Sequence, residues 1–172
     1  MNEKQCLLQQ IYENVKSWVH FIEAKNAALI TADLSIIAIL FASNLPKYLL
    51  FNISITLLLI SLICALLSFK PINEFKKVST RNIKENLLYF AYIASLEKEE
   101  YIEKLYRYYW GNNNIEMKEV SYIEQHYCQE IIANARITLI KQKFFKVSFA
   151  FMFVSIILII ILIIFMIVEK YV

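Results

Sequence analysis

Three long apolar runs divide this chain into membrane-sized and polar segments. They cover residues 27–45, 48–69 and 147–168, and the only formal charge inside any of them is that of Asp33. A helix that crosses the hydrocarbon of a bilayer needs about 20 predominantly apolar residues. The third run is rich in isoleucine, which favours strands in water, but a lone strand cannot satisfy its backbone groups in lipid. All three runs are therefore predicted to be transmembrane helices.

The charges that flank these runs predict their orientation. Basic residues gather after the second run, in residues 70–81, and before the third run, in residues 141–146. By the positive-inside rule, both of these flanks lie on the cytoplasmic side. Pro46 lies in the short link between the first two runs and ends the first helix, so these two helices form a tight hairpin. We expect a multi-pass protein with a cytoplasmic N-terminus.

The first 26 residues carry the pattern of an amphipathic helix. Apolar side chains recur at spacings of three and four residues, which places them on one face. We expect a cytoplasmic helix over residues 1–26 that continues directly into the first crossing. The stripe consists of Leu8, Ile11, Val15, Trp18 and Ile22.

Residues 70–146 are polar and are expected to form a small cytoplasmic helical domain. The pattern predicts a helix over residues 82–94, and a second helix with Ser95 as its N-cap that ends near Trp110 and Gly111. A loop at residues 112–114 is followed by a helical pattern that runs into the third crossing. That last helix would have roughly 50 residues and a length of about 75 Å. We hypothesise that it couples cytoplasmic events mechanically to the membrane.

The predicted fold is therefore an all-α membrane protein. It has three transmembrane helices, an N-terminal hairpin plus a C-terminal helix, with the helical domain between the second and the third. The composition agrees, because 59% of the residues are hydrophobic and the mean hydropathy is +0.49.

The same composition excludes several classes of function. A single glycine, Gly111, cannot build a GxGxxG turn or a Walker-type phosphate loop. The three cysteines suggest neither a disulfide framework nor a CxxC metal site, and no ligand set surrounds His20 or His126. The weak net charge of residues 70–146 argues against a nucleic-acid partner. We expect no enzyme activity, no metal and no cofactor.

Asp33 draws attention because charged residues within the membrane are rare and tend to face the interior of a bundle. Asn26, Asp33 and Asn44 fall near one helix face and could form an intramembrane polar seam that lines a pore or an oligomer contact. Alternatively, Asp33 hydrogen-bonds locally or stays protonated, and the residues alone leave both interpretations open. The second run offers several possible partners, namely Asn52, Ser54, Thr56 and Ser61.

An aromatic cluster lies within the second helix of the polar domain, around Arg107. Aromatic rings and a guanidinium group can stack on a base and bind a phosphate. Packing of these rings against a neighbouring helix or the membrane interface is the interpretation we favour. The cluster consists of Tyr101, Tyr106, Tyr108, Tyr109 and Trp110.

The order of these parts resembles the transmembrane effector family of the Pycsar antiphage systems. The likeness extends over most of the chain and depends on the order and spacing of several segments together. These segments are residues 21–30 (FIEAKNAALI), 68–71 (SFKP), 86–90 (NLLYF), 95–101 (SLEKEEY) and the basic passage into the third crossing, 129–146.

This resemblance implies a receptor for a second messenger in the bacterial inner membrane. An adjacent pyrimidine cyclase would supply cyclic CMP or cyclic UMP, and the effector would then disrupt the bilayer as a homo-oligomer and cause abortive infection. A nucleotide site would have to be a helical pocket, which we expect to lie between subunits. Its candidate residues are Arg81, Arg107, Arg136, Tyr101 and Tyr109.

Two other functions remain open at this point. One is an ungated small channel or holin-like protein, which would be toxic without any cyclase. The other is a non-toxic membrane adaptor that recruits a partner through its cytoplasmic helices. Composition and periodicity establish a topology, and the resemblance alone supplies the preference for a gated effector.

Overall fold

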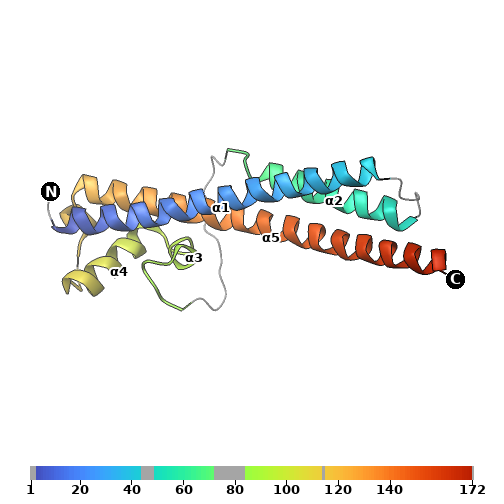
Figure 1. Cartoon of the computed structure of the whole chain (residues 1–172). Helices are drawn as coiled ribbons and strands as arrows, with labels where there is room; N and C mark the ends of the chain where they lie inside the picture. The colour runs from blue at the N-terminus through green and yellow to red at the C-terminus, as the bar shows by residue number, and fades with distance from the viewer. Residues whose placement is uncertain (1–2, 44–48, 72–83, 114, 172) are drawn as a thin grey trace. The chain divides into compact units, whose positions relative to one another are not determined.

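The computed structural model describes residues 3–43, 49–71, 84–113 and 115–171, and its regular segments are all helical. No strand occurs among these residues, which confirms the all-α prediction for this part of the chain. The elements, labelled in Figure 1, are α1 (Glu3–Ala42), α2 (Leu49–Leu67), α3 (Phe90–Ile93), α4 (Lys98–Trp110), the 3₁₀ turn η1 (Met117–Glu119) and α5 (Tyr122–Tyr171).

The chain divides into two compact units. Unit 1 comprises residues 1–22 and 71–141, and unit 2 comprises residues 23–70 and 142–172. These limits fall a few residues from the predicted boundaries between polar and apolar segments. The two longest helices, α1 and α5, each contribute residues to both units.

Unit 2 contains the apolar parts of α1, α2 and α5, which lie side by side in Figure 1. These three helices are long and apolar enough to cross a membrane, as the sequence predicts. Helix α1 ends at Ala42, slightly before the predicted end of the first run, and the link at residues 44–48 lies outside the described residues. A small apolar core holds the unit together, formed by Leu40, Phe51, Leu58 and Leu162.

Most of the outer surface of unit 2 is apolar. Most large aliphatic and aromatic side chains of α2 and α5 point away from the core, which is the arrangement expected when lipid is the solvent. The exposed side chains on α5 include Phe149, Phe153, Ile157, Ile160 and Phe165.

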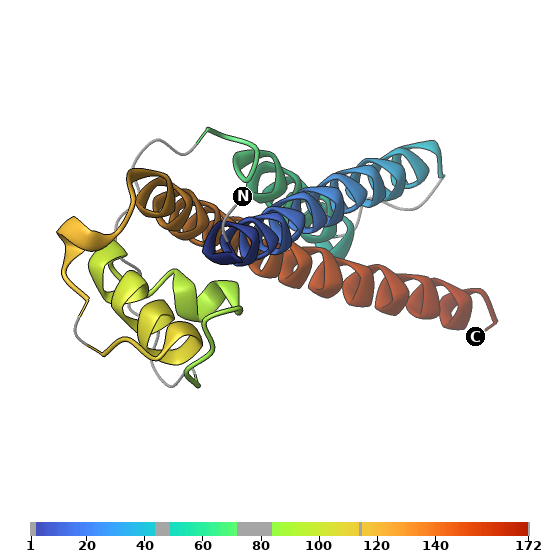
Figure 2. The same cartoon turned by 90° about the vertical axis from the view of Figure 1, so that its left-hand side faces the viewer.

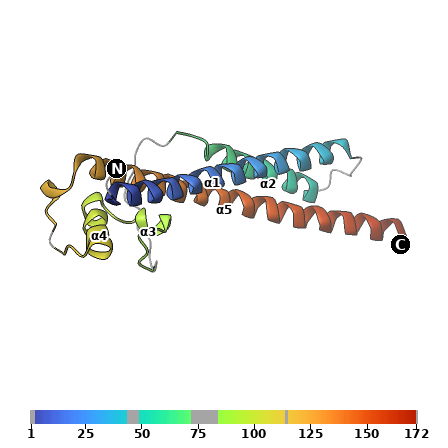
Figure 3. The ribbon, with the colours of Figure 1, turned by 60° about the vertical axis from the view of Figure 1, so that its left-hand side comes forward.

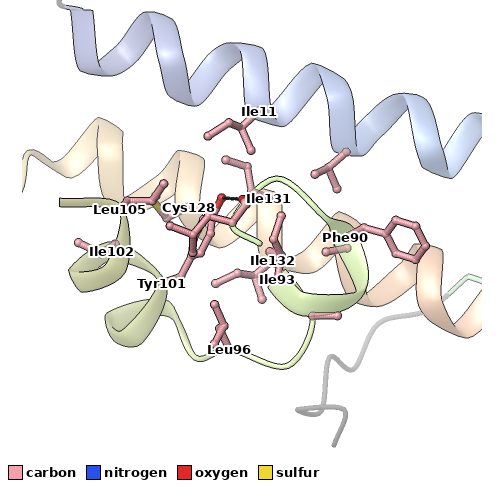
Figure 4. Close-up of a cluster of buried hydrophobic side chains, with 14 of the residues drawn as sticks. Ile11, Phe90, Ile93, Leu96, Tyr101, Ile102, Leu105, Cys128, Ile131 and Ile132 are labelled. Carbon is pink, nitrogen blue, oxygen red and sulfur yellow. Dashed lines mark hydrogen bonds between the residues drawn. The ribbon is translucent and has the colours of Figure 1, made fainter. Parts of the chain in front are cut away.

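Unit 1 has its own hydrophobic core. Figures 2 and 3 show α3 and α4 beside the N-terminal part of α1 and the first part of α5. Figure 4 shows how Ile11 of α1, Ile93 of α3, Leu105 of α4 and Ile131 of α5 converge. Leu8, Ile11 and Val15 of the predicted stripe belong to this core, and Ile22 is buried. Trp18 is 38% exposed and contacts Phe21 and Phe90.

Helix α5 begins with a capping box and then runs unbroken for 50 residues, which confirms the predicted long helix. The backbone N–H of Glu124 donates to the Ser121 hydroxyl at 3.3 Å, and the N–H of Ser121 donates to the Glu124 carboxylate at 3.2 Å. This reciprocal pair satisfies two backbone donors that the helix itself cannot bond. The helix therefore has a defined start at Tyr122.

The predicted helix over residues 82–94 is wrong for its described part, because only α3, Phe90–Ile93, is helical there. The side-chain oxygen of Asn86 accepts a hydrogen bond from the N–H of Leu88 at 2.9 Å. Such local bonds offer the backbone an alternative to the helix. The chain consequently turns at Leu87 and Leu88 before α3 begins.

The predicted N-cap of α4 is also wrong, although its predicted end is confirmed. The Ser95 hydroxyl donates to the carbonyl of Tyr92 at 2.6 Å, and the residue at the cap position is Glu97. At the other end, Gly111 has φ +65°, a left-handed conformation that glycine adopts without strain. The single glycine of the chain thus terminates α4.

Candidate functional sites

A buried polar network joins the three helices of unit 2. The hydroxyl of Ser61 on α2 donates to the Asp33 carboxylate oxygen Oδ2 on α1 at 2.7 Å. It also lies 2.9 Å from both the carbonyl oxygen and the hydroxyl of Ser148 on α5. The Ser148 hydroxyl in turn donates to the carbonyl oxygen of Ser61 at 2.6 Å. All three residues are completely buried.

A spacing of seven residues along each helix explains why these groups meet. Positions seven apart fall on nearly the same face of a helix, two turns away from each other. On α5 the buried Ser155 follows Ser148 by seven residues, and its hydroxyl donates to the carbonyl of Ser54 at 2.9 Å. The three buried series are Asn26, Asp33 and Leu40 on α1, Ser54, Ser61 and Ser68 on α2, and Ser148, Ser155 and Leu162 on α5.

The structure describes two of the three residues of the predicted polar seam. Asn26 and Asp33 are both fully buried in unit 2, whereas Asn44 lies outside the described residues. Ser61 is the partner of Asp33 and was among the predicted candidates on the second run. The sequence analysis missed Ser148 and Ser155, although their spacing of seven within an otherwise aliphatic run is the signal that could have identified them.

Arg136, a predicted nucleotide contact, lies in unit 1 beside a hollow of about 460 Å³ between α5 and the start of α4. Its guanidinium donates to the backbone carbonyls of Ala94 and Leu96, at 3.3 and 2.8 Å, and reaches the Glu97 carboxylate at 3.4 Å. The Arg136 side chain therefore stabilises the turn between α3 and α4. The hollow is lined by Glu97, Lys98, Gln129, Glu130, Ile132, Ala133 and Arg136.

The other predicted nucleotide contacts are dispersed. Arg107 is exposed and forms an ion pair with Glu103 at 2.6 Å within α4. Tyr109 borders a separate hollow of about 330 Å³ beside Leu87. The ring of Tyr101 is fully enclosed in the core, where Figure 4 shows it, and it presents no surface on which a base could stack. Arg81 lies outside the described residues.

An aromatic hollow that the sequence analysis missed adjoins the one at Arg136. It has a volume of about 470 Å³, and it shares Glu130 with its neighbour. The rings of Tyr122 and His126 are 4.3 Å apart at its edge. No motif marks this hollow, because Tyr12 is contributed by α1 and the other residues by the first turns of α5. Its lining consists of Tyr12, Tyr122, Ile123, His126, Tyr127 and Glu130.

A buried ionisable cluster stabilises the core of unit 1 beside these hollows. The Tyr106 hydroxyl donates to the Glu124 carboxylate at 2.9 Å. Burial and the neighbouring Glu124 carboxylate raise the pKa of Tyr106, and they raise the pKa of the Cys128 thiol to about 12. The thiol of Cys128 is therefore protonated at neutral pH and is a poor nucleophile.

No group of three histidine, cysteine or acidic side chains that could ligate a metal occurs among the described residues.

The sequence of the chain matches one known protein family. A family model described as the Pycsar effector protein domain, PycTM, matches residues 7–168 and includes parts of both units. No curated protein and no solved structure matches the chain. The matched family is one of antiphage effectors and is not an enzyme family. Because the match covers nearly the whole sequence, the chain belongs to the PycTM family of Pycsar effector proteins.

Proposed function

We propose that this chain is a membrane effector that a cyclic pyrimidine nucleotide activates during phage infection. An adjacent pyrimidine cyclase makes cyclic CMP or cyclic UMP, the effector binds it, and the inner membrane is then disrupted so that the cell dies before phage is released. The observation that carries this proposal is the family match over residues 7–168, because it includes residues of unit 1 and all three apolar helices.

The proposed membrane action requires several copies of the chain. Asn26, Asp33, Ser61 and Ser148 are buried inside unit 2 and most of its outer surface is apolar, so one chain offers lipid a largely hydrophobic surface. Three helices that pack directly on one another enclose no channel. We therefore propose a homo-oligomer in the inner membrane, with the N-terminus and residues 70–146 in the cytoplasm, as the basic flanks predict.

The two adjoining hollows of unit 1 support a nucleotide site. A cyclic nucleotide has an anionic phosphate and a planar base, and it requires a basic contact next to an aromatic surface. Arg136 and Lys98 supply positive charge in one hollow, while Tyr122 and His126 supply ring surfaces in the other. Both volumes are within the range of small-molecule sites. Glu130, which borders both, is an acceptor suited to the exocyclic amine of cytosine.

The remaining predicted nucleotide contacts are secondary in this proposal. Arg81, which lies outside the described residues, and Arg107 stay proposed phosphate contacts, and Tyr109 lies at the edge of another hollow. We assign Tyr101 to the core of unit 1 because of its complete burial. The phosphate contact we test first is Lys98, because Arg136 also donates to the carbonyls of Ala94 and Leu96.

A thermal-shift measurement on the purified full-length chain in detergent tests this function. The ligands are 3′,5′-cyclic CMP, UMP, AMP and GMP, and a ligand that binds only the folded state raises Tm. We expect one pyrimidine nucleotide to raise Tm selectively and to trigger dye leakage from liposomes that contain the protein. Leakage without any ligand would instead identify an ungated channel, and binding without leakage would favour the adaptor.

Substitutions in the two hollows locate the site. We expect Lys98→Ala and Tyr122→Ala to reduce the ligand-induced rise in Tm, because they remove a phosphate contact and a ring surface. Lys118→Ala is the matched control, since Lys118 is exposed and pairs with Glu116 away from both hollows. A ligand response that survives both hollow substitutions would place the nucleotide elsewhere.

A further inference from the structure

The network around Asp33 has more hydrogen-bond acceptors than donors. A serine hydroxyl carries one hydrogen and an ionised carboxylate carries none. The Ser148 hydrogen is directed to the carbonyl of Ser61, and the single Ser61 hydrogen is shared between Asp33 Oδ2 and the carbonyl of Ser148. Asp33 Oδ1 is buried and accepts no hydrogen bond from any residue that the structure describes.

This site lies within the apolar segments of all three helices. A buried carboxylate oxygen without a partner is strongly unfavourable in a medium of low polarity. Oxygens of carboxylates, hydroxyls and carbonyls are the ligands that hard cations take in proteins, and they line the selectivity filters of cation channels. Around Asp33 these three kinds of oxygen are contributed by α1, α2 and α5 together. A cation bound to these oxygens would supply the balancing positive charge.

We propose that Asp33, Ser61 and Ser148 form a binding site for a monovalent alkali cation inside unit 2. One carboxylate neutralises one positive charge, so a divalent ion at this site would leave an unbalanced charge in hydrocarbon. The occupant is accordingly Na⁺ or K⁺.

The thermal stability of the reconstituted chain in different salts tests for cation binding. The full chain is reconstituted in phosphatidylcholine nanodiscs, and Tm is measured in NaCl, KCl or N-methyl-D-glucamine chloride at equal ionic strength. We expect Na⁺ or K⁺ to raise Tm above the value in the bulky organic cation, because a small ion can bind directly to the oxygens of the three side chains. Equal Tm values in all three salts would overturn the proposal.

Two variants distinguish this site from a general salt effect. Asp33→Asn keeps the shape of the side chain but removes its charge, and it should abolish the difference between the salts. Ser35→Ala is the matched control, because Ser35 is exposed on the same helix and its hydroxyl donates to the carbonyl of Thr31. A salt difference that Asp33→Asn retains would contradict the proposal. A pH dependence of Tm that Asp33→Asn abolishes, without any dependence on the metal ion, would identify a proton on Asp33 and would overturn the proposal as well.

Discussion

The hydroxyl of Tyr106 on α4 donates a hydrogen bond of 2.9 Å to the carboxylate of Glu124 on α5. The same carboxylate caps α5 by accepting the N–H of Ser121, so one buried acid connects the packing of α4 to the start of the longest helix. Glu124 is only 5% exposed, and each donor therefore compensates for the removal of its charge from water.

Tyr106→Phe is expected to destabilise the protein because it leaves the buried Glu124 carboxylate with one donor fewer. Loss of a partner for a buried polar group costs about 1–3 kcal/mol. The measurement is Tm of the detergent-solubilised chain. Tyr109→Phe serves as control, since Tyr109 is 43% exposed, and it should leave Tm unchanged. Equal effects of the two substitutions would argue against a special role for the Tyr106 bond.

Arg136→Met is expected to lower Tm, because the carbonyls of Ala94 and Leu96 lose their guanidinium donor. Each carbonyl left without a partner costs about 1–3 kcal/mol if it stays buried. Arg107→Met is the comparison, since its ion pair with Glu103 is exposed and is worth at most about 1 kcal/mol. An Arg136 variant as stable as the Arg107 variant would show that the turn between α3 and α4 does not depend on this side chain.

Stability should fall in alkaline solution as the core of unit 1 ionises. The pKa of Cys128 is raised from 9.0 to about 12, and those of Tyr101 and Tyr106 are raised from 10.0, in each case chiefly by burial. The folded state thus keeps these protons to a higher pH than the unfolded state. The stabilisation is complete below about pH 9 and is lost progressively as the pH rises towards 12.

Thermal unfolding measured as a function of pH tests this expectation. Cys128→Ala should make the decline of Tm above about pH 9 shallower, because one linked proton is removed. Cys6→Ala changes a cysteine outside the core cluster and should retain the slope of the native protein. A Cys128 variant with an unchanged slope would assign the alkaline decline to the tyrosines alone.

Gly111→Ala should destabilise α4 at its C-terminus. Gly111 has φ +65°, where a Cβ atom costs roughly 1–2 kcal/mol, although no atom beyond its two chain neighbours lies within 4 Å of the added carbon. Gly111→Asn should lose less, because asparagine tolerates the left-handed region better than alanine. Tm values for both variants give the comparison, and an alanine variant as stable as the native protein would show that the turn can relax.

Hydrogen exchange should reveal an unbroken α5. Residues 141–146 lie inside this helix, so their amides are bonded along the backbone like those of neighbouring turns. Slow exchange through this segment would support the hypothesis that the helix transmits changes mechanically. Rapid exchange confined to residues 141–146 would contradict it.

Sequence reasoning succeeded where the determining interaction is local. The stripe on α1, the end of α4 at Gly111 and the long α5 all follow from periodicity, from one glycine and from the absence of a helix breaker. It failed near Asn86, where a side-chain bond to Leu88 competes with the helix, and at Ser95, whose hydroxyl bonds backwards to Tyr92. Helical propensity does not report such competing bonds.

By itself, the sequence determined three membrane-sized helices and an all-α fold, since hydropathy, length and backbone satisfaction in lipid depend only on neighbouring residues. Tertiary structure alone decided which polar groups meet. Asp33 bonds to Ser61, 28 residues away, and Ser61 to Ser148, 87 residues away. The aromatic hollow likewise combines Tyr12 with the first turns of α5. Contacts of this kind depend on how helices rotate and pack against one another, and a pattern within one helix cannot specify its neighbour.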